Sequence, residues 1–115
     1  MNLEQMITDV LRAIGAPAHL KGYHLTRYAL AWMIEEHIDM PVGVTKHVYT
    51  AVSRRFDMSV AAVEHSIRHF ITATWRTAPT PTRETLFGAK KPSNIAFLAT
   101  ILDDLRVYQK AGAVQ

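Results

Sequence analysis

The chain has 115 residues, of which 49% are hydrophobic and 20% are charged, with a formal net charge of +3 and no cysteine. This length suits one core and is too short for two typical domains, so we expect a single domain over residues 1–115. The composition excludes a disordered chain, and the lack of cysteine excludes disulfides and thiolate metal sites.

No stretch of the sequence resembles a secretory signal or a membrane span. The first ten residues, MNLEQMITDV, lack the basic start of a signal peptide, and the longest apolar run covers only residues 29–34. A spanning helix needs about 20 apolar residues. We therefore expect a cytoplasmic protein with no membrane partner.

Two helices, separated by a loop over residues 16–23, are predicted in the first third of the chain. The first is expected over residues 3–14, ended by Gly15, because apolar residues recur there at helical spacing: Met6, Ile7, Val10, Leu11 and Ile14. The second is expected over residues 24–38. Its apolar residues are Leu25, Tyr28, Ala29, Trp32 and Met33.

Residues 45–76 have the pattern of a helix-turn-helix. One helix is expected over residues 45–56, followed by a turn at residues 57–59 in which Ser59 caps the second helix, over residues 60–76. Five residues of the second helix fall within an arc of about 100° and are expected to be buried. They are Val63, Ile67, Phe70, Ile71 and Thr74.

The opposite face of this second helix is rich in hydrogen-bonding groups. It carries Ala61, Glu64, His65, Arg68, His69, Thr72 and Arg76. Such a face suits a helix that contacts base edges in a major groove. Two packed helices with a solvated polar face would have the same pattern, so the pattern alone leaves both interpretations open.

The last third of the chain predicts a loop and then a helix. The prolines and threonines of residues 77–84 favour a loop, and a short helical turn at residues 85–87 would end at Gly88. Ser93 is expected to cap a final helix over residues 94–110, with buried Phe97, Leu98, Ile101, Leu102 and Leu105. We find no strand pattern, so the predicted class is all-α, with five to six helices around the helix-turn-helix and no wing.

Positive charge is concentrated in the helix-turn-helix and the loop after it. Residues 45–93 hold eight Lys and Arg against three Asp and Glu, whereas residues 1–44 hold three against five. A polyanion would dock on the basic part, although a solvated basic surface would have the same composition.

Four runs of the sequence together resemble a known family. The runs are IGAPAHLKGY, VTKHVYTAVSRRFDMSVAAVEHSIRHFITATW, LFG and KPSNIAFLATILDDLR, and they span about residues 7–106. They are similar to the C-terminal effector domain of the sporulation master response regulator of endospore-forming bacteria. The resemblance implies about six helices that bind a short promoter box and activate or repress transcription. It also implies that the second helix of the unit enters the major groove, with Glu64, Arg68 and His69 matching the family motif.

The sequence departs from this family in three ways. Ala62 and His65 stand where the family has two arginines, and the connection over residues 88–90 is shorter than in the family. Members also carry an N-terminal receiver domain, for which this chain has no room. We expect either the effector half of a longer protein or a free-standing paralogue without its own phosphorylation switch.

The predicted DNA contacts fall into two groups. Side chains expected to face bases are Glu64, His65, Arg68 and His69. Residues expected to face phosphates are Thr45, Lys46, Ser59, Arg76, Lys90 and Lys91. Lysine and arginine would act through their charge, and Thr45 and Ser59 through the N-termini of the helices that they cap.

Other chemistries find little support in the sequence. His65 and His69 stand four residues apart and could bind zinc, but two imidazoles make a weak site and no carboxylate is placed to complete it. HExxH, glycine-rich phosphate-loop and nucleophile-elbow motifs are absent from the sequence. We predict neither a metal, nor a cofactor, nor an enzyme.

A second hypothesis is a degenerate effector domain that no longer reads DNA. Its motivation is the loss of the two family arginines at Ala62 and His65 together with the missing receiver domain. Such a domain would instead bind a full-length regulator or an RNA polymerase sigma subunit. Under the first hypothesis the partners are double-stranded DNA and, by resemblance, a second copy of the chain on tandem boxes.

Overall fold

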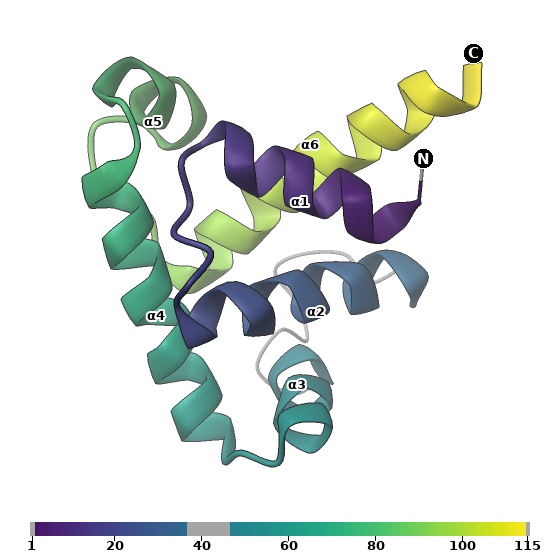
Figure 1. The fold of residues 1–115 in the computed structure, drawn as a ribbon, viewed down its shortest axis with the longest axis vertical. Helices are drawn as coiled ribbons and strands as arrows, with labels where there is room; N and C mark the ends of the chain where they lie inside the picture. The colour runs from purple at the N-terminus through teal and green to yellow at the C-terminus, as the bar shows by residue number, and fades with distance from the viewer. Residues whose placement is uncertain (1, 37–46, 115) are drawn as a thin grey trace.

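The computed structural model describes residues 2–36 and 47–114, along which six helices follow one another (Figure 1). They are α1 (Leu3–Ala13), α2 (Lys21–Glu35), α3 (Tyr49–Phe56), α4 (Val60–Thr77), α5 (Thr80–Phe87) and α6 (Asn94–Val114). The described residues contain no strand. The predicted all-α class without a wing is therefore confirmed.

α1 matches its predicted range to within one residue. It begins where the side chain of Asn2 accepts a hydrogen bond of 2.8 Å from the backbone N–H of Gln5. It ends before Gly15, whose φ of 78° is in the left-handed region that a glycine adopts without strain. Of its predicted apolar residues, four are buried and Val10 is half-buried.

α2 begins at Lys21, so the prediction that residues 21–23 belong to a loop is wrong. Gly22 explains the difference. A Cβ atom on Gly22 would lie 2.3 Å from the backbone oxygen of Ser66 and 2.5 Å from Cβ of Phe70. The glycine therefore allows close packing of α2 on α4, and it does not mark a turn. The predicted end of this helix, near residue 38, lies outside the described residues.

α5 is longer than predicted, which corrects the expected loop over residues 77–84. It starts at Thr80 because Pro81 stands in its first turn, where the N–H that proline lacks would have no helical partner. Only Ala78 and Pro79 separate α4 from α5. The predicted end at Gly88, with φ of 84°, is confirmed.

α6 begins where the sequence predicts and continues further than predicted. The side-chain oxygen of Ser93 accepts a hydrogen bond of 3.1 Å from the backbone N–H of Ala96, and the helix reaches Val114 instead of ending at Lys110. All five of its predicted core residues are buried: Phe97, Leu98, Ile101, Leu102 and Leu105. None of the described helices combines the length and the apolar character that crossing a membrane requires.

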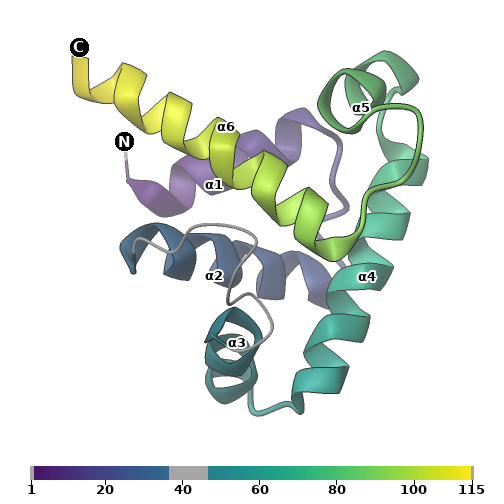
Figure 2. The same ribbon diagram turned by 180° about the vertical axis from the view of Figure 1, so that it is seen from behind.

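The helices place α4 at one edge of the molecule. α1 packs on α2 and α6, and α4 crosses α2 and α6 near their N-terminal ends (Figures 1 and 2). Phe70 of α4 lies edge-on to Tyr23 of α2 and to Phe97 of α6, with ring centroids 6.0 and 6.1 Å apart. One side of α4 is thus held by the core, and both views show no helix beyond its other side.

Candidate nucleic-acid interface

α3 and α4 meet at a tight corner. Asp57 ends α3 in the left-handed conformation, with φ of 53°, and the N–H of Met58 donates to the backbone oxygen of Ser53 at 3.0 Å. The side chain of Ser59 then accepts a hydrogen bond of 3.1 Å from the N–H of Ala62. The turn at residues 57–59 and the N-cap at Ser59 are therefore as predicted.

The inner side of α4 is the predicted stripe, residue for residue. Its buried residues are Val63, Ile67, Phe70, Ile71 and Thr74. Thr74, the polar member, donates its hydroxyl to the backbone oxygen of Phe70 at 2.8 Å, so its burial leaves no unpaired hydroxyl. Contacts with α2, α3 and α6 on this side determine which face of α4 remains outside.

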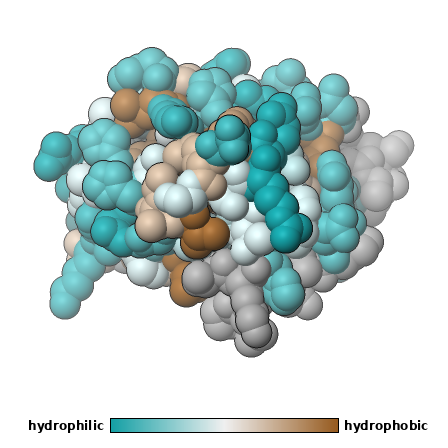
Figure 3. All heavy atoms as spheres, turned by 90° about the horizontal axis from the view of Figure 1, so that it is seen from below, coloured by the Kyte–Doolittle hydropathy of each residue, from teal (hydrophilic) through white to brown (hydrophobic). Residues whose placement is uncertain are grey.

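The outer face of α4 carries the polar residues that the sequence predicts to contact DNA. His65, Arg68, His69 and Arg76 are exposed, and Glu64 and Thr72 are partly exposed. Figure 3 shows the molecule from below Figure 1, the end at which α3 and α4 meet, and the coloured surface at this end is mostly hydrophilic or intermediate, with several small apolar patches. The structure thus presents the four predicted base-facing residues on one helix face.

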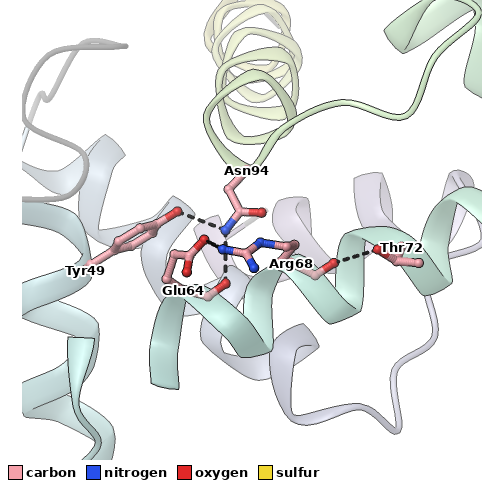
Figure 4. Close-up of polar contacts among 5 residues, drawn as sticks. All are labelled: Tyr49, Glu64, Arg68, Thr72 and Asn94. Atoms are coloured by element: carbon pink, nitrogen blue, oxygen red, sulfur yellow. Dashed lines mark hydrogen bonds and ion pairs between the residues drawn. The ribbon is translucent and has the colours of Figure 1, made fainter. Parts of the chain in front are cut away.

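Glu64 and Arg68 form an ion pair on this face, in which Nη2 of Arg68 donates to Oε1 of Glu64 (Figure 4). The arginine side chain is 55% exposed and the glutamate side chain 36% exposed. An exposed pair at this spacing contributes only about 0.3–0.5 kcal/mol. The pair therefore orients the guanidinium along α4, while a stronger acceptor could still displace the carboxylate.

The loop between α5 and α6 brings a lysine onto the same face. Nζ of Lys91 donates to the hydroxyl of Thr72 at 2.9 Å, and that hydroxyl donates to the backbone oxygen of Arg68 at 3.1 Å. Lys90 is exposed beside it in the sequence. Positive groups from two separate parts of the chain are thus brought together along α4.

Three more residues are predicted to face phosphates: Thr45, Lys46 and Ser59. Thr45 and Lys46 lie outside the described residues. The Ser59 side chain already accepts the N–H of Ala62, so a phosphate near it would meet the other free N–H groups of the first turn of α4.

Two further arginines, on the adjoining helix α3, have no predicted role. Arg54 and Arg55 are exposed on the last turn of α3. The guanidinium of Arg55 lies 5.1 Å from the ring centroid of Phe56 and 5.9 Å from that of Tyr28. The sequence signal was present, because two adjacent arginines precede the turn of a predicted helix-turn-helix.

A third arginine holds the C-terminal end of α4. Nη1 of Arg83, in α5, donates to the backbone oxygen of Trp75 at 2.7 Å, and its guanidinium lies 4.7 Å from the indole ring centroid. Carbonyl groups in the last turn of a helix lack helical partners, so this bond stabilises the helix end.

Sequence reasoning missed a buried polar cluster behind the outer face. Nδ2 of Asn94, at the start of α6, donates to the hydroxyl oxygen of Tyr49 and to the backbone oxygen of Glu64, each at 3.1 Å (Figure 4). Burial raises the pKa of the Tyr49 phenol, against smaller opposing effects of the Asn94 hydrogen bond and the Arg68 charge. No local pattern links residues 45 positions apart, so this cluster could not be predicted from the sequence.

Metal ligation has no cluster to support it in the described part of the chain. There, no three or more His, Cys, Asp or Glu side chains are grouped so that they could hold a metal ion. His65 and His69 face solvent. They are available for hydrogen bonds to an external ligand.

A comparison with known families agrees with this geometry. The family model described as "Sporulation initiation factor Spo0A C terminal" matches residues 7–105 of the 115-residue chain, a range that extends from α1 into α6. Members of this family are DNA-binding regulator domains, and the family is not a known enzyme family. The chain belongs to the sporulation initiation factor Spo0A C-terminal family, the DNA-binding effector domains of sporulation transcription regulators.

Proposed function

We propose that the chain recognises a short box in double-stranded DNA by placing the outer face of α4 in the major groove. The observation that carries this proposal is the division of α4 into a fully buried face and an exposed, hydrogen-bonding face at the edge of the molecule. A helix is about 10–12 Å in diameter, and the major groove is about 12 Å wide. Exposed side chains on such a helix would reach base edges.

The base-facing group in this proposal is Glu64, His65, Arg68 and His69. Arg68 would donate two hydrogen bonds to a guanine, leaving Glu64 to accept from a cytosine amino group, because these pairings match the donors and acceptors of each base. The two histidines would complete the face as donors or acceptors. The weak Glu64–Arg68 pair would be exchanged for these contacts.

The phosphate-facing group would fix the protein on the duplex without reading sequence. It comprises Thr45, Lys46, Ser59, Arg76, Lys90 and Lys91. Lys91 is the best supported of these, since its ammonium group already lies on α4 through Thr72. Each lysine that meets a phosphate would add to the salt dependence of binding.

We also propose that the box differs from that of relatives that carry two arginines on this helix. Ala62 has no side-chain donor, and an arginine pairing with guanine contributes about 1–3 kcal/mol of discrimination. His65 offers one ring edge where an arginine would offer a fork of donors. Fewer guanines would therefore be read at these two positions. The protein would work on promoters in the cytoplasm, and a second copy could occupy a tandem box.

One observation favours a second candidate function. Arg68 is already paired with Glu64, so the net charge of the outer face is lower than its arginine and lysine content implies. With Ala62 and His65 in place of arginines, the domain would then act by binding a full-length regulator or an RNA polymerase sigma subunit. In that case the outer face would contact protein instead of DNA.

Selection from random duplexes at two salt concentrations distinguishes the candidates. The DNA-reading proposal expects an enriched motif and binding that weakens steeply as salt rises. Steep salt dependence without enrichment would leave DNA binding but exclude sequence reading. No binding of any duplex at low salt would contradict the proposal and support the protein-interaction candidate.

A further inference from the structure

A short segment that precedes and starts α6 is fastened along one row of α4. The row consists of Glu64, Arg68 and Thr72, which are four residues apart and so lie above one another on the helix. Lys91 bonds the row at Thr72, and Asn94 bonds it at Glu64 (Figure 4 shows the Asn94 end). The two attachment points are about 12 Å apart at 1.5 Å per residue. The segment therefore holds α4 at both ends of this row, which includes two of the proposed base-facing residues, Glu64 and Arg68.

Asn94 makes the more restrictive of the two attachments. It is only 9% exposed, and its amide group joins three helices, because Tyr49 belongs to α3 and Glu64 to α4. Tyr49 is 3% exposed, and this burial raises the pKa of its hydroxyl. The bond to Glu64 is to its main chain, so it fixes the backbone at the residue whose side chain orients Arg68.

Two types of DNA contact would respond differently to the loss of this attachment. Hydrogen bonds to base edges weaken steeply when donor and acceptor are misaligned. The attraction between a lysine and a phosphate falls slowly over a Debye length of about 8 Å at physiological salt. A shift of α4 by a fraction of an ångström would therefore harm base reading more than phosphate binding.

We propose that Asn94 is a positioning residue for sequence reading: through Tyr49 and the Glu64 carbonyl it sets the place of α4 in the groove, without itself contacting DNA. This inference rests on the proposed function and adds a residue that determines specificity from behind the helix. Removing the amide leaves the buried hydroxyl oxygen of Tyr49 and the partly buried carbonyl oxygen of Glu64 without this donor, and it lets α4 relax against α3 and α6.

The test compares Asn94→Ala and Tyr49→Phe with the wild-type protein. The dissociation constant is measured for the selected duplex and for a scrambled duplex of equal length, over a range of salt. We expect the ratio of the two constants to fall about tenfold for Asn94→Ala, and about threefold for Tyr49→Phe, which removes one hydrogen-bond acceptor and keeps the ring. The salt slope should not change, because no phosphate contact is removed.

Asn2→Ala is the matched control, since Asn2 makes a helix-capping bond to Gln5 in α1, away from α4. It should lower the melting temperature and leave the specificity ratio unchanged. Equal weakening on both duplexes in the Asn94 and Tyr49 variants would show a merely structural role and overturn the inference. If Asn94→Ala does not fold, the test rests on Tyr49→Phe. A ratio of the two dissociation constants equal to that of the wild-type protein in Tyr49→Phe would then also overturn the inference. A wild-type protein that binds no duplex specifically would instead contradict the proposed function.

Discussion

Arg68 and the lysines near it differ in what their side chains can distinguish. A guanidinium is a planar fork that matches the two acceptors of guanine, whereas an ammonium group is a compact charge that any phosphate satisfies. Arg68 is on α4 itself, while Lys90 and Lys91 come from the loop before α6. We therefore assign sequence reading to Arg68 and attraction of the DNA backbone to the lysines.

Replacing Arg68 by alanine should weaken binding to the selected duplex by about 1–3 kcal/mol. Binding to a scrambled duplex should change much less. There the Arg68 side chain stays paired with Glu64, because no guanine stands at the position that it would read. Competition titrations with both duplexes measure the two losses. Losses of the same size on both would show that Arg68 contributes only charge.

Replacing Lys90 by alanine should weaken binding to all duplexes alike. The slope of log affinity against log salt should become shallower by about one, since one phosphate contact is lost. Lys110→Ala serves as the control, because Lys110 is exposed on the distant part of α6. A loss that depends on the duplex sequence, or an equal change of slope in the control, would refute the assignment.

At the level of elements, the contact between α2 and α4 is unusually close at Gly22. In a helix, alanine is normally favoured over glycine by about 1 kcal/mol. Here a methyl group would lie 2.3 Å from a backbone oxygen of α4, an atom that cannot turn away as a flexible side chain could. The steric effect should therefore exceed the helix propensity and reverse its sign.

Gly22→Ala should lower the free energy of unfolding by about 1–3 kcal/mol, as overpacking of a core contact typically does. Urea denaturation followed by circular dichroism measures the change. Gly88→Ala is the comparison, because a methyl group there meets no atom within 4 Å and only the left-handed φ of 84° opposes it. A stabilised Gly22→Ala variant would show that the close approach is not maintained in solution.

Elements whose signal is periodic could be predicted from the sequence. The buried stripe of α4 and the core residues of α6 were predicted correctly because burial repeats every three to four residues along one helix. Gly22 and Pro81 misled the prediction. Each is compatible with a turn or with a helix, and the choice depends on a neighbouring helix for Gly22 and on position in the first turn for Pro81.

Parts of the candidate site that depend on contacts between distant segments could not be predicted. The outer face of α4 followed from the period of one helix. The bonds of Asn94 to Tyr49 and Glu64, and of Lys91 to Thr72, exist only because the fold brings α3, α4 and the start of α6 together. A single sequence contains no local pattern for such pairs.

For the whole molecule, the distribution of charge agrees with the proposed direction of docking. Residues 45–93, which include α3, α4 and α5, carry the excess of positive charge, and residues 1–44 carry an excess of negative charge. A duplex approaching the molecule would be attracted to the helix-turn-helix and repelled by the acidic part. Orientation would thus be set before the base contacts form.

In the proposed binding mode, the outer face of α4 is the surface that meets DNA. Backbone amide chemical shifts of the isotope-labelled protein, followed by NMR during titration with the selected duplex, test it most directly. We expect the largest changes at α4, around His65, Arg68 and His69, with further changes at Lys90 and Lys91. Changes confined to α1, α5 and the C-terminal half of α6, with α4 unaffected, would contradict it.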